Sequence, residues 1–230
     1  MKKVLSRILP LLTIALLVAM VSGAAFAQAC GGIVPEVSVL GAPGTGEDAE
    51  ECFTTNYFAN NTTAGAPDGT LRYTEHYGGL LKSGLKLCAN IYVFAADQQP
   101  TECCSCLITP NGLVTTSVKT QLTSNPLTGV VPPDGVVQIV SSLVPPGGCD
   151  PTFGALAVGT TIVLPQAPFP EVDSWLTHIQ NKVGTAFPIT ETEGVEELLT
   201  AGEFDDLAID CAFVQEFGSG AGVCSCGTEN

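Results

Sequence analysis

The sequence predicts a mainly β protein: an antiparallel β-sandwich, Ig-like or jelly-roll-like, stapled by disulfides and followed by a short C-terminal helical segment. Short runs rich in Val, Ile, Thr and aromatic residues alternate with turn-forming Gly, Pro and Asn residues. The chain also has ten cysteines, a density that is typical of proteins in oxidising compartments. Helical periodicity is confined to the C-terminal third.

The N-terminal residues 1–27 have the pattern of a signal peptide. A basic start precedes an almost wholly apolar run that ends in the motif AFA, and small residues of this kind mark the cleavage site of export signals. Cleavage is expected after Ala27 or Ala29, which predicts a secreted or periplasmic location. An uncleaved anchor helix is one alternative, because the apolar run is long enough to span a bilayer. Acylation of Cys30 is another, although Ala27 stands where a Leu-like residue is preferred.

The charge of the chain restricts its partners. Three of the eight Lys and Arg residues lie in the predicted signal, so 8 − 3 = 5 remain against 23 acidic residues, a formal net charge of 5 − 23 = −18. Nucleic acid and anionic membrane surfaces are bound through Lys and Arg, so the sequence argues against both. An extracellular protein partner or self-association stays compatible, as does cation binding. The simplest interpretation of the charge is solubility outside the cell.

Removal of the signal leaves 230 − 27 = 203 residues, which is enough for a single domain with a sizeable core. Residues 28–52 are rich in Gly, Pro and acidic residues and are predicted to form an irregular N-terminal arm. Residues 53–230 are predicted to form one β-rich domain. A loop near its start carries two overlapping N-x-T sequons, at Asn60 and Asn61.

Several segments of the domain are predicted to be strands, and Gly- and Pro-containing turns separate them. In the segment that begins at Leu85, both alternating sets of side chains are largely apolar, so this strand is expected at the centre of a sheet with both faces covered. The predicted strands are Thr70–Tyr77, Leu85–Ala95, Leu113–Thr123, Val136–Val144 and Ala155–Leu164.

Two helices are predicted, at about residues 171–183 and 201–217. In the first, apolar residues recur at helical spacing, and this set includes Trp175, which is therefore expected in the core. In the second, a T-x-x-E capping box begins at Thr200. An apolar stripe that includes Cys211 then faces the core, while the acidic residues face water.

The cysteines are interpreted as structural disulfide partners. Cys103 and Cys104 are expected to reach two different partners, with Cys88 and Cys149 as candidates, because a bridge between neighbouring residues would be strained. Cys211 is expected to bridge to at least one cysteine of the C-terminal tail. The disulfide candidates are Cys30, Cys52, Cys88, Cys103, Cys104, Cys106, Cys149, Cys211, Cys224 and Cys226.

The sequence also predicts where two sets of these cysteines lie. The cluster around Cys104 is predicted to lie between two strands of the stretch Leu85–Gly129 and to staple them. Cys30 and Cys52 bracket the N-terminal arm, so they either pair with each other or fix its two ends separately.

A thiolate metal site or a redox site is the alternative interpretation of the cysteines. The spacings C-C-x-C and C-x-C match the paired ligands of zinc sites poorly. Neither His76 nor His178 lies at ligand spacing to a cysteine. The pair Cys224 and Cys226 has no basic neighbour in the sequence that would lower a thiol pKa. No metal or cofactor is therefore assigned to any residue.

No catalytic constellation is visible in the sequence. Glu75 and His76 are adjacent, but neighbouring side chains on a strand point to opposite faces. His178 is placed on the predicted helix at 171–183, where a surface or capping histidine is commoner than a general base. The patterns G-x-S-x-G, H-E-x-x-H and the phosphate-binding loop are absent from the sequence. The acidic residues also lack the spacing of a calcium-binding loop.

The blocks CANIYVFAADQQPTECCSCLITPNGL, LTSNPLTG, WLTHIQ, TAGEFDDLAIDCAF and GSGAGVCSC resemble a group of functionally uncharacterised secreted bacterial proteins, chiefly acidobacterial. This resemblance implies export and brings no activity, substrate or cofactor. The function expected from the residues is that of an exported noncatalytic structural or interaction module. The alternatives are a secreted hydrolase whose site residues are scattered along the sequence, and a thiolate metal-binding or redox protein.

Overall fold

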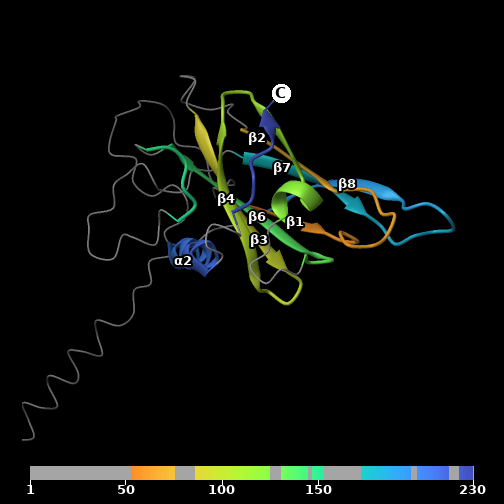
Figure 1. Cartoon of the computed structure of the whole chain (residues 1–230). Helices are drawn as coiled ribbons and strands as arrows, with labels where there is room; N and C mark the ends of the chain where they lie inside the picture. The colour runs from red at the N-terminus through yellow and green to blue at the C-terminus, as the bar shows by residue number, and fades with distance from the viewer. Residues whose placement is uncertain are drawn as a thin grey trace, which may run out of the picture.

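The computed structural model describes residues 53–75, 86–124, 131–144, 147–152, 172–197, 201–217 and 223–229. Within these residues the fold consists of two five-stranded antiparallel sheets that pack against each other, with one α-helix on the outside (Figure 1). The prediction of an antiparallel β-sandwich followed by a short helix is confirmed. No helix in the described part of the chain is long and apolar enough to cross a membrane.

Several predicted features lie outside the described residues. These are the signal peptide, the N-terminal arm with Cys30 and Cys52, His76, and the strand at Ala155–Leu164.

The first sheet, which we call sheet A, has the strand order β4-β3-β6-β1-β9. β3 lies between β4 and β6, and its residues are buried on both faces from Leu87 to Val93, as its doubly apolar pattern predicted. The strands of sheet A are β1 (Phe53–Phe58), β3 (Leu87–Ala95), β4 (Pro100–Ile108), β6 (Gly135–Leu143) and β9 (Val195–Glu197).

The second sheet, sheet B, has the order β10-β5-β2-β7-β8. β5 ends earlier than predicted because the chain turns at Ser117 into a π-helical turn, η1 (Val118–Leu122), whose Thr120 amide donates to the Ser117 hydroxyl. The strands of sheet B are β2 (Thr70–Glu75), β5 (Leu113–Ser117), β7 (Val172–Ile179), β8 (Ile189–Glu193) and β10 (Thr228–Glu229).

The main core lies between the two sheets. It is built from alternate residues of the facing strands, among them Leu71 and Tyr73 of β2 and Ile91 of β3. The side chains of these three residues are fully buried. Burial of each large apolar side chain stabilises the fold by about 1.5–3 kcal/mol, so this core is the principal source of stability.

The helix predicted at 171–183 is wrong, because residues Val172–Ile179 form β7 at an inner position of sheet B. The residues that face the core alternate along this strand and include Ser174 and His178, both buried. Because Ser174 and His178 are polar, the inward positions of this strand do not form an apolar pattern with a period of two. Apolar residues from both faces of the strand recur instead at the spacing of a helix. Trp175 lies on the outward side and is half-buried, so its predicted place in the core is also wrong.

The second predicted helix is confirmed as α2 (Ala201–Phe217). Its buried side chains, Leu207, Cys211 and Val214 among them, lie on one face, as the apolar stripe predicted. Leu207 and Cys211 pack with Phe53 of β1 and other residues on the outer side of sheet A. α2 therefore covers the outer face of sheet A (Figure 1).

At one lateral side of the sandwich, a single glycine carries the chain from sheet B to sheet A. Gly194 links β8 to β9, and its amide donates to the Ser174 carbonyl at 2.8 Å. The Ser174 hydroxyl forms hydrogen bonds with Thr54 at 2.6 Å and Asn56 at 2.8 Å, both from β1. A polar seam of Thr54, Asn56 and Ser174 thus joins the two sheets where the chain crosses between them.

We expect Gly194→Ala to destabilise the protein by about 1–3 kcal/mol. A Cβ at this position would lie 2.6 Å from Ser174 Oγ and 2.8 Å from Asn56 Nδ2, so the polar seam would have to separate. Urea unfolding midpoints measure the effect, and Val195→Ala, at the neighbouring exposed position, is the matched control. Equal midpoints for the two variants would contradict the tight packing of this crossing.

Candidate functional site

The cysteine cluster lies within β4 rather than between strands, so its predicted position in a connecting segment is wrong. Successive side chains of a strand point to opposite faces. Cys103 accordingly packs in the cluster beneath α2, whereas Cys104 and Cys106 lie in the core between the sheets. The motif C-C-x-C therefore serves two different faces of one strand.

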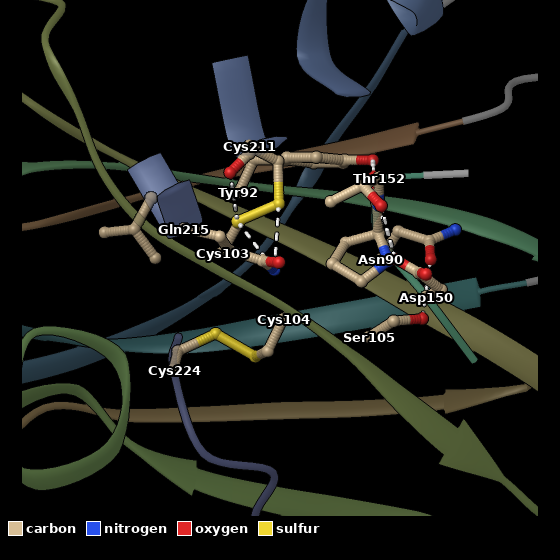
Figure 2. Close-up of a disulfide and its surroundings, with 12 residues drawn as sticks. Asn90, Tyr92, Cys103, Cys104, Ser105, Asp150, Thr152, Cys211, Gln215 and Cys224 are labelled. Carbon is tan, nitrogen blue, oxygen red and sulfur yellow. Dashed lines mark hydrogen bonds between the residues drawn. A yellow bond between two sulfur atoms is a disulfide. The ribbon is translucent and has the colours of Figure 1, made fainter. Parts of the chain in front are cut away.

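Four disulfides join the described cysteines. Cys103 and Cys104 reach different partners, as predicted: the first bonds to Cys211 of α2 and the second to Cys224 of the tail (Figure 2). The other two disulfides are Cys106–Cys226 and Cys88–Cys149.

Two predicted pairings are wrong. Cys88 and Cys149 bond to each other and not to Cys103 or Cys104. Cys211 does not bridge to the tail, because α2 lies on the outer face of sheet A, where Cys103 is the β4 cysteine that it meets. The four described disulfides indicate that the protein folds in an oxidising, extracellular or periplasmic environment.

The tail connects the two sheets at the lateral side opposite Gly194. The Cys224 amide donates to the Cys103 carbonyl at 3.1 Å, which places the tail along the edge strand β4 of sheet A. Four residues later the same segment pairs with β5 as β10, with Thr228 opposite Thr115. The tail thus belongs to both sheets, and two disulfides fix it to β4.

Three cysteine sulfurs come close enough together to suggest a metal centre. The Sγ atoms of Cys104, Cys106 and Cys226 lie within 4.8 Å of one another. This convergence follows from the two adjacent disulfides, because each of these atoms is bonded to a partner sulfur. A disulfide sulfur is not a thiolate ligand, so a metal could bind here only after reduction of both bonds. In the oxidised protein the cluster is structural.

The outer face of sheet A is closely packed around the Cys103–Cys211 disulfide (Figure 2). Gln215 of α2 donates its side-chain amide towards both sulfurs, at 3.6 and 3.5 Å. The Tyr92 hydroxyl donates to the Pro151 carbonyl at 3.0 Å. Burial, followed by the nearby Asp150 carboxylate, raises the pKa of Tyr92 well above its usual range, so this phenol stays neutral.

His178 lies on β7 and not on a helix as predicted. Its ring is buried and stacks on Tyr57, with 3.9 Å between ring centroids and an angle of 18°. Nε2 forms a hydrogen bond with the Thr192 hydroxyl. Burial lowers the pKa of His178. A neutral imidazole held between an aromatic ring and a hydroxyl is a packing element, and this environment does not support a role as general base.

Other polar residues noted in the sequence also have structural partners. The Glu75 carboxylate accepts from the Asn111 amide at 3.2 Å in a neighbouring turn. In the sequon loop, Asn61 Nδ2 donates to Thr123 Oγ1 at 2.9 Å, and Asn60 Nδ2 donates to the Ile179 carbonyl at 2.8 Å. The amide nitrogens that would carry a glycan are therefore engaged within the fold.

The outer face of sheet B presents a different set of side chains. Trp175 lies there between Arg72 of β2 and Glu193 of β8, which are its register partners. Arg72 forms an ion pair with Glu191, and their side chains are 38% and 45% exposed. Sequence reasoning missed this surface because Trp175 was placed on a helix. The signal that could have found it is the alternation of residues 172–178.

Comparisons with protein-family models, with curated proteins and with solved structures find no match to this chain. The functional interpretation therefore depends on the geometry described above.

We expect the two tail disulfides to be strongly non-additive in stability. They close loops of the same length, with a sequence separation of 120 residues each, and either one alone holds the tail against β4. Replacing both cysteines of one pair by Ala should cost about 2 kcal/mol, whereas replacing both pairs should cost about 5 kcal/mol or more. Urea unfolding under nonreducing conditions measures these differences.

The Cys88→Ala, Cys149→Ala variant is the control for this experiment. Its disulfide closes a different loop, with a separation of 61 residues, so its cost should add to that of either tail pair. Simple additivity between the two tail pairs would show that they do not act on a shared loop.

We expect His178 to make the protein less stable as the pH falls. Burial lowers the pKa of His178 in the folded state, so the unfolded chain binds a proton at higher pH than the folded chain does. Its contribution is fully present above the unfolded pKa of about 6.5 and is lost as the pH falls through the folded pKa. Unfolding free energies from pH 7.5 downwards, compared between the natural chain and His178→Gln, isolate this effect from the titration of carboxylates. A larger pH dependence in His178→Gln would contradict it.

Proposed function

We propose that the chain is an exported noncatalytic module that acts through its surface, as a structural or interaction component outside the cytoplasm. Export is supported by the signal-like residues 1–27 and by disulfides that require an oxidising compartment. The observation that carries the proposal is the double attachment of the tail, which belongs to sheet B as β10 and is bonded to β4 of sheet A. Such cross-linking produces a rigid unit.

The interior of the sandwich supports the same conclusion. Several polar groups of the described interior are engaged in packing: His178 stacks on Tyr57, and Ser174 links the sheets through β1. Glu75 accepts from a backbone amide. A general acid or base needs access to a substrate proton, and these groups are arranged instead to hold strands together. Function is therefore expected on the outer surfaces.

The proposal is tested on the full chain expressed with its own N-terminus in a bacterial host. The intact mass of the exported product should correspond to a chain that begins at Gln28 or at Cys30. These are the chains expected from cleavage after Ala27 or Ala29. The purified product should show no turnover of chromogenic ester, glycoside or peptide substrates. Chemical cross-linking on the native cell surface should capture the protein with defined neighbours.

A hydrolytic activity that copurifies with the chain and disappears in Glu75→Gln or His178→Gln would overturn the noncatalytic interpretation. A product retained in the cytoplasm with reduced cysteines would overturn export. Nonreducing peptide mapping distinguishes reduced from bonded cysteines in the same sample.

A further inference from the structure

The two disulfides that hold the tail lie side by side and join two C-x-C segments. Cys104 and Cys106 belong to β4, and their partners Cys224 and Cys226 belong to the tail. We call these four residues the tail-cysteine cluster. Cys104 and Cys106 lie on the same face of β4, and their Sγ atoms are 3.9 Å apart although each is bonded to a different partner. The cluster therefore brings a sulfur of one disulfide into contact with a sulfur of the other.

One residue of the tail-cysteine cluster is accessible from solvent. Cys226 is exposed, whereas Cys104, Cys106 and Cys224 are buried. Disulfides are opened when a thiolate attacks one of their two sulfurs, and access decides which sulfur is attacked. A small thiol in solution therefore reaches the Cys106–Cys226 disulfide at Cys226, while the Cys104–Cys224 disulfide is shielded at both ends.

We propose that the tail-cysteine cluster is a thiol-exchange site, at which a low-molecular-weight thiol reacts with Cys226 and the reaction passes through Cys106 and Cys104 to release the tail. In the first step the external thiolate forms a bond to Cys226 Sγ, and the bond between Cys226 and Cys106 breaks. Cys106 keeps the electron pair of the broken bond and becomes a thiolate. Cys226 then carries the external thiol as a mixed disulfide.

The second step opens the shielded disulfide. Cys106 Sγ lies 3.9 Å from Cys104 Sγ, so the Cys106 thiolate bonds to Cys104 and displaces Cys224 as a thiolate. An unpaired charge is costly in a buried position, and Cys224 belongs to a tail that no disulfide then holds, so its thiolate can move into water. Two steps along a strand span about 6.6 Å, which lies within the Cα separations of disulfides, and a Cys104–Cys106 bond is therefore attainable.

The third step returns the external thiol. The Cys224 thiolate attacks the Cys226 sulfur of the mixed disulfide, forms a Cys224–Cys226 bond and expels the external thiolate. The cluster begins and ends with two disulfides, so the exchange has no net oxidant or reductant and the thiol acts as a catalyst. The pairing changes from two bonds between β4 and the tail to one bond within each C-x-C segment.

Release of the tail uncovers an edge of each sheet. The tail lies along β4, where the Cys224 amide donates to the Cys103 carbonyl, and it pairs with β5 as β10. Exposed strand edges promote association with other chains. The exchange thus changes which surfaces the protein presents while its number of disulfides stays the same. It goes beyond the proposed function, which requires no thiol.

The first test uses the intact, oxidised, exported protein with reduced glutathione at mildly alkaline pH. After acid quenching and alkylation of thiols, nonreducing peptide mapping should find Cys104–Cys106 and Cys224–Cys226 bonds, with glutathione on Cys226 at early times. The Cys103–Cys211 disulfide, which is buried at both ends, is the internal control and should stay intact. Hydrogen exchange in the peptide that contains β5 should become faster over the same period, because β10 no longer pairs with it.

Variants then test the transfer from Cys106 to Cys104. In Cys226→Ser, Cys106 is a free thiol beside the Cys104–Cys224 bond, so iodoacetamide without glutathione should alkylate the released Cys224 and a Cys104–Cys106 bond should accumulate. The double variant Cys106→Ser, Cys226→Ser is the matched control, because its Cys104–Cys224 bond has no neighbouring thiol. With glutathione, this bond should open at least about tenfold more slowly than in the natural chain, since reaction between neighbouring groups is favoured by proximity. Thermal unfolding verifies that each variant is folded.

Several results would overturn the proposal. In the natural chain, these are opening of Cys106–Cys226 while Cys104–Cys224 stays intact, or opening of Cys103–Cys211 at the same rate as Cys106–Cys226, which would indicate general unfolding. In the variants, they are alkylation of Cys106 alone in Cys226→Ser, or equal opening of Cys104–Cys224 in the double variant and the natural chain. None of these results bears on the noncatalytic module, because cross-linked neighbours and the absence of turnover are measured separately.

Discussion

The attachment of the C-terminal tail to both sheets is the constraint on which the architecture depends. Cys104 and Cys106 point from β4 into the space between the sheets, and their disulfides hold the tail at the edge of sheet A. A few residues later the tail pairs with β5 and becomes the edge of sheet B. An edge strand exposes unpaired backbone groups that invite association with other chains. The tail occupies the edges of β4 and β5 together, so one short segment protects both sheets on that side.

In the described part of the chain, the opposite side is closed without a disulfide. There the chain passes directly from β8 to β9 through Gly194, and the small residue permits Ser174, Thr54 and Asn56 to approach one another. Hydrogen bonds of this kind contribute only about 1 kcal/mol each, so this side depends on continuity of the chain for its strength. On the tail side the chain also crosses between the sheets, from β4 to β5 through residues 109–112, but the tail itself is far from β4 in the sequence. The disulfides Cys104–Cys224 and Cys106–Cys226 therefore hold in place a tail that the crossing from β4 to β5 does not itself attach.

Much of the fold could be predicted from local pattern, and the failures have a common physical origin. β2, β3 and β6 were found because their inward positions are apolar and their ends carry turn residues. β7 was missed because Ser174 and His178 occupy inward positions, where partners from distant strands satisfy them. The pairing of Cys103 and Cys104 failed for a related reason. Once β4 is known to be a strand, alternation separates Cys103 from Cys104 and Cys106, but the sequence alone does not show which face meets α2 and which meets the tail.

The error at β7 also misplaced the only tryptophan of the chain. As a helix, residues 171–183 would bury Trp175 in the core. As a strand, the same residues send Ser174 and Leu176 inwards and Trp175 outwards, between Arg72 and Glu193. The change from one period to another moves a single side chain from the core to the surface. Because α2 is bonded to sheet A through Cys103–Cys211, Trp175 lies on the sheet face that α2 does not cover.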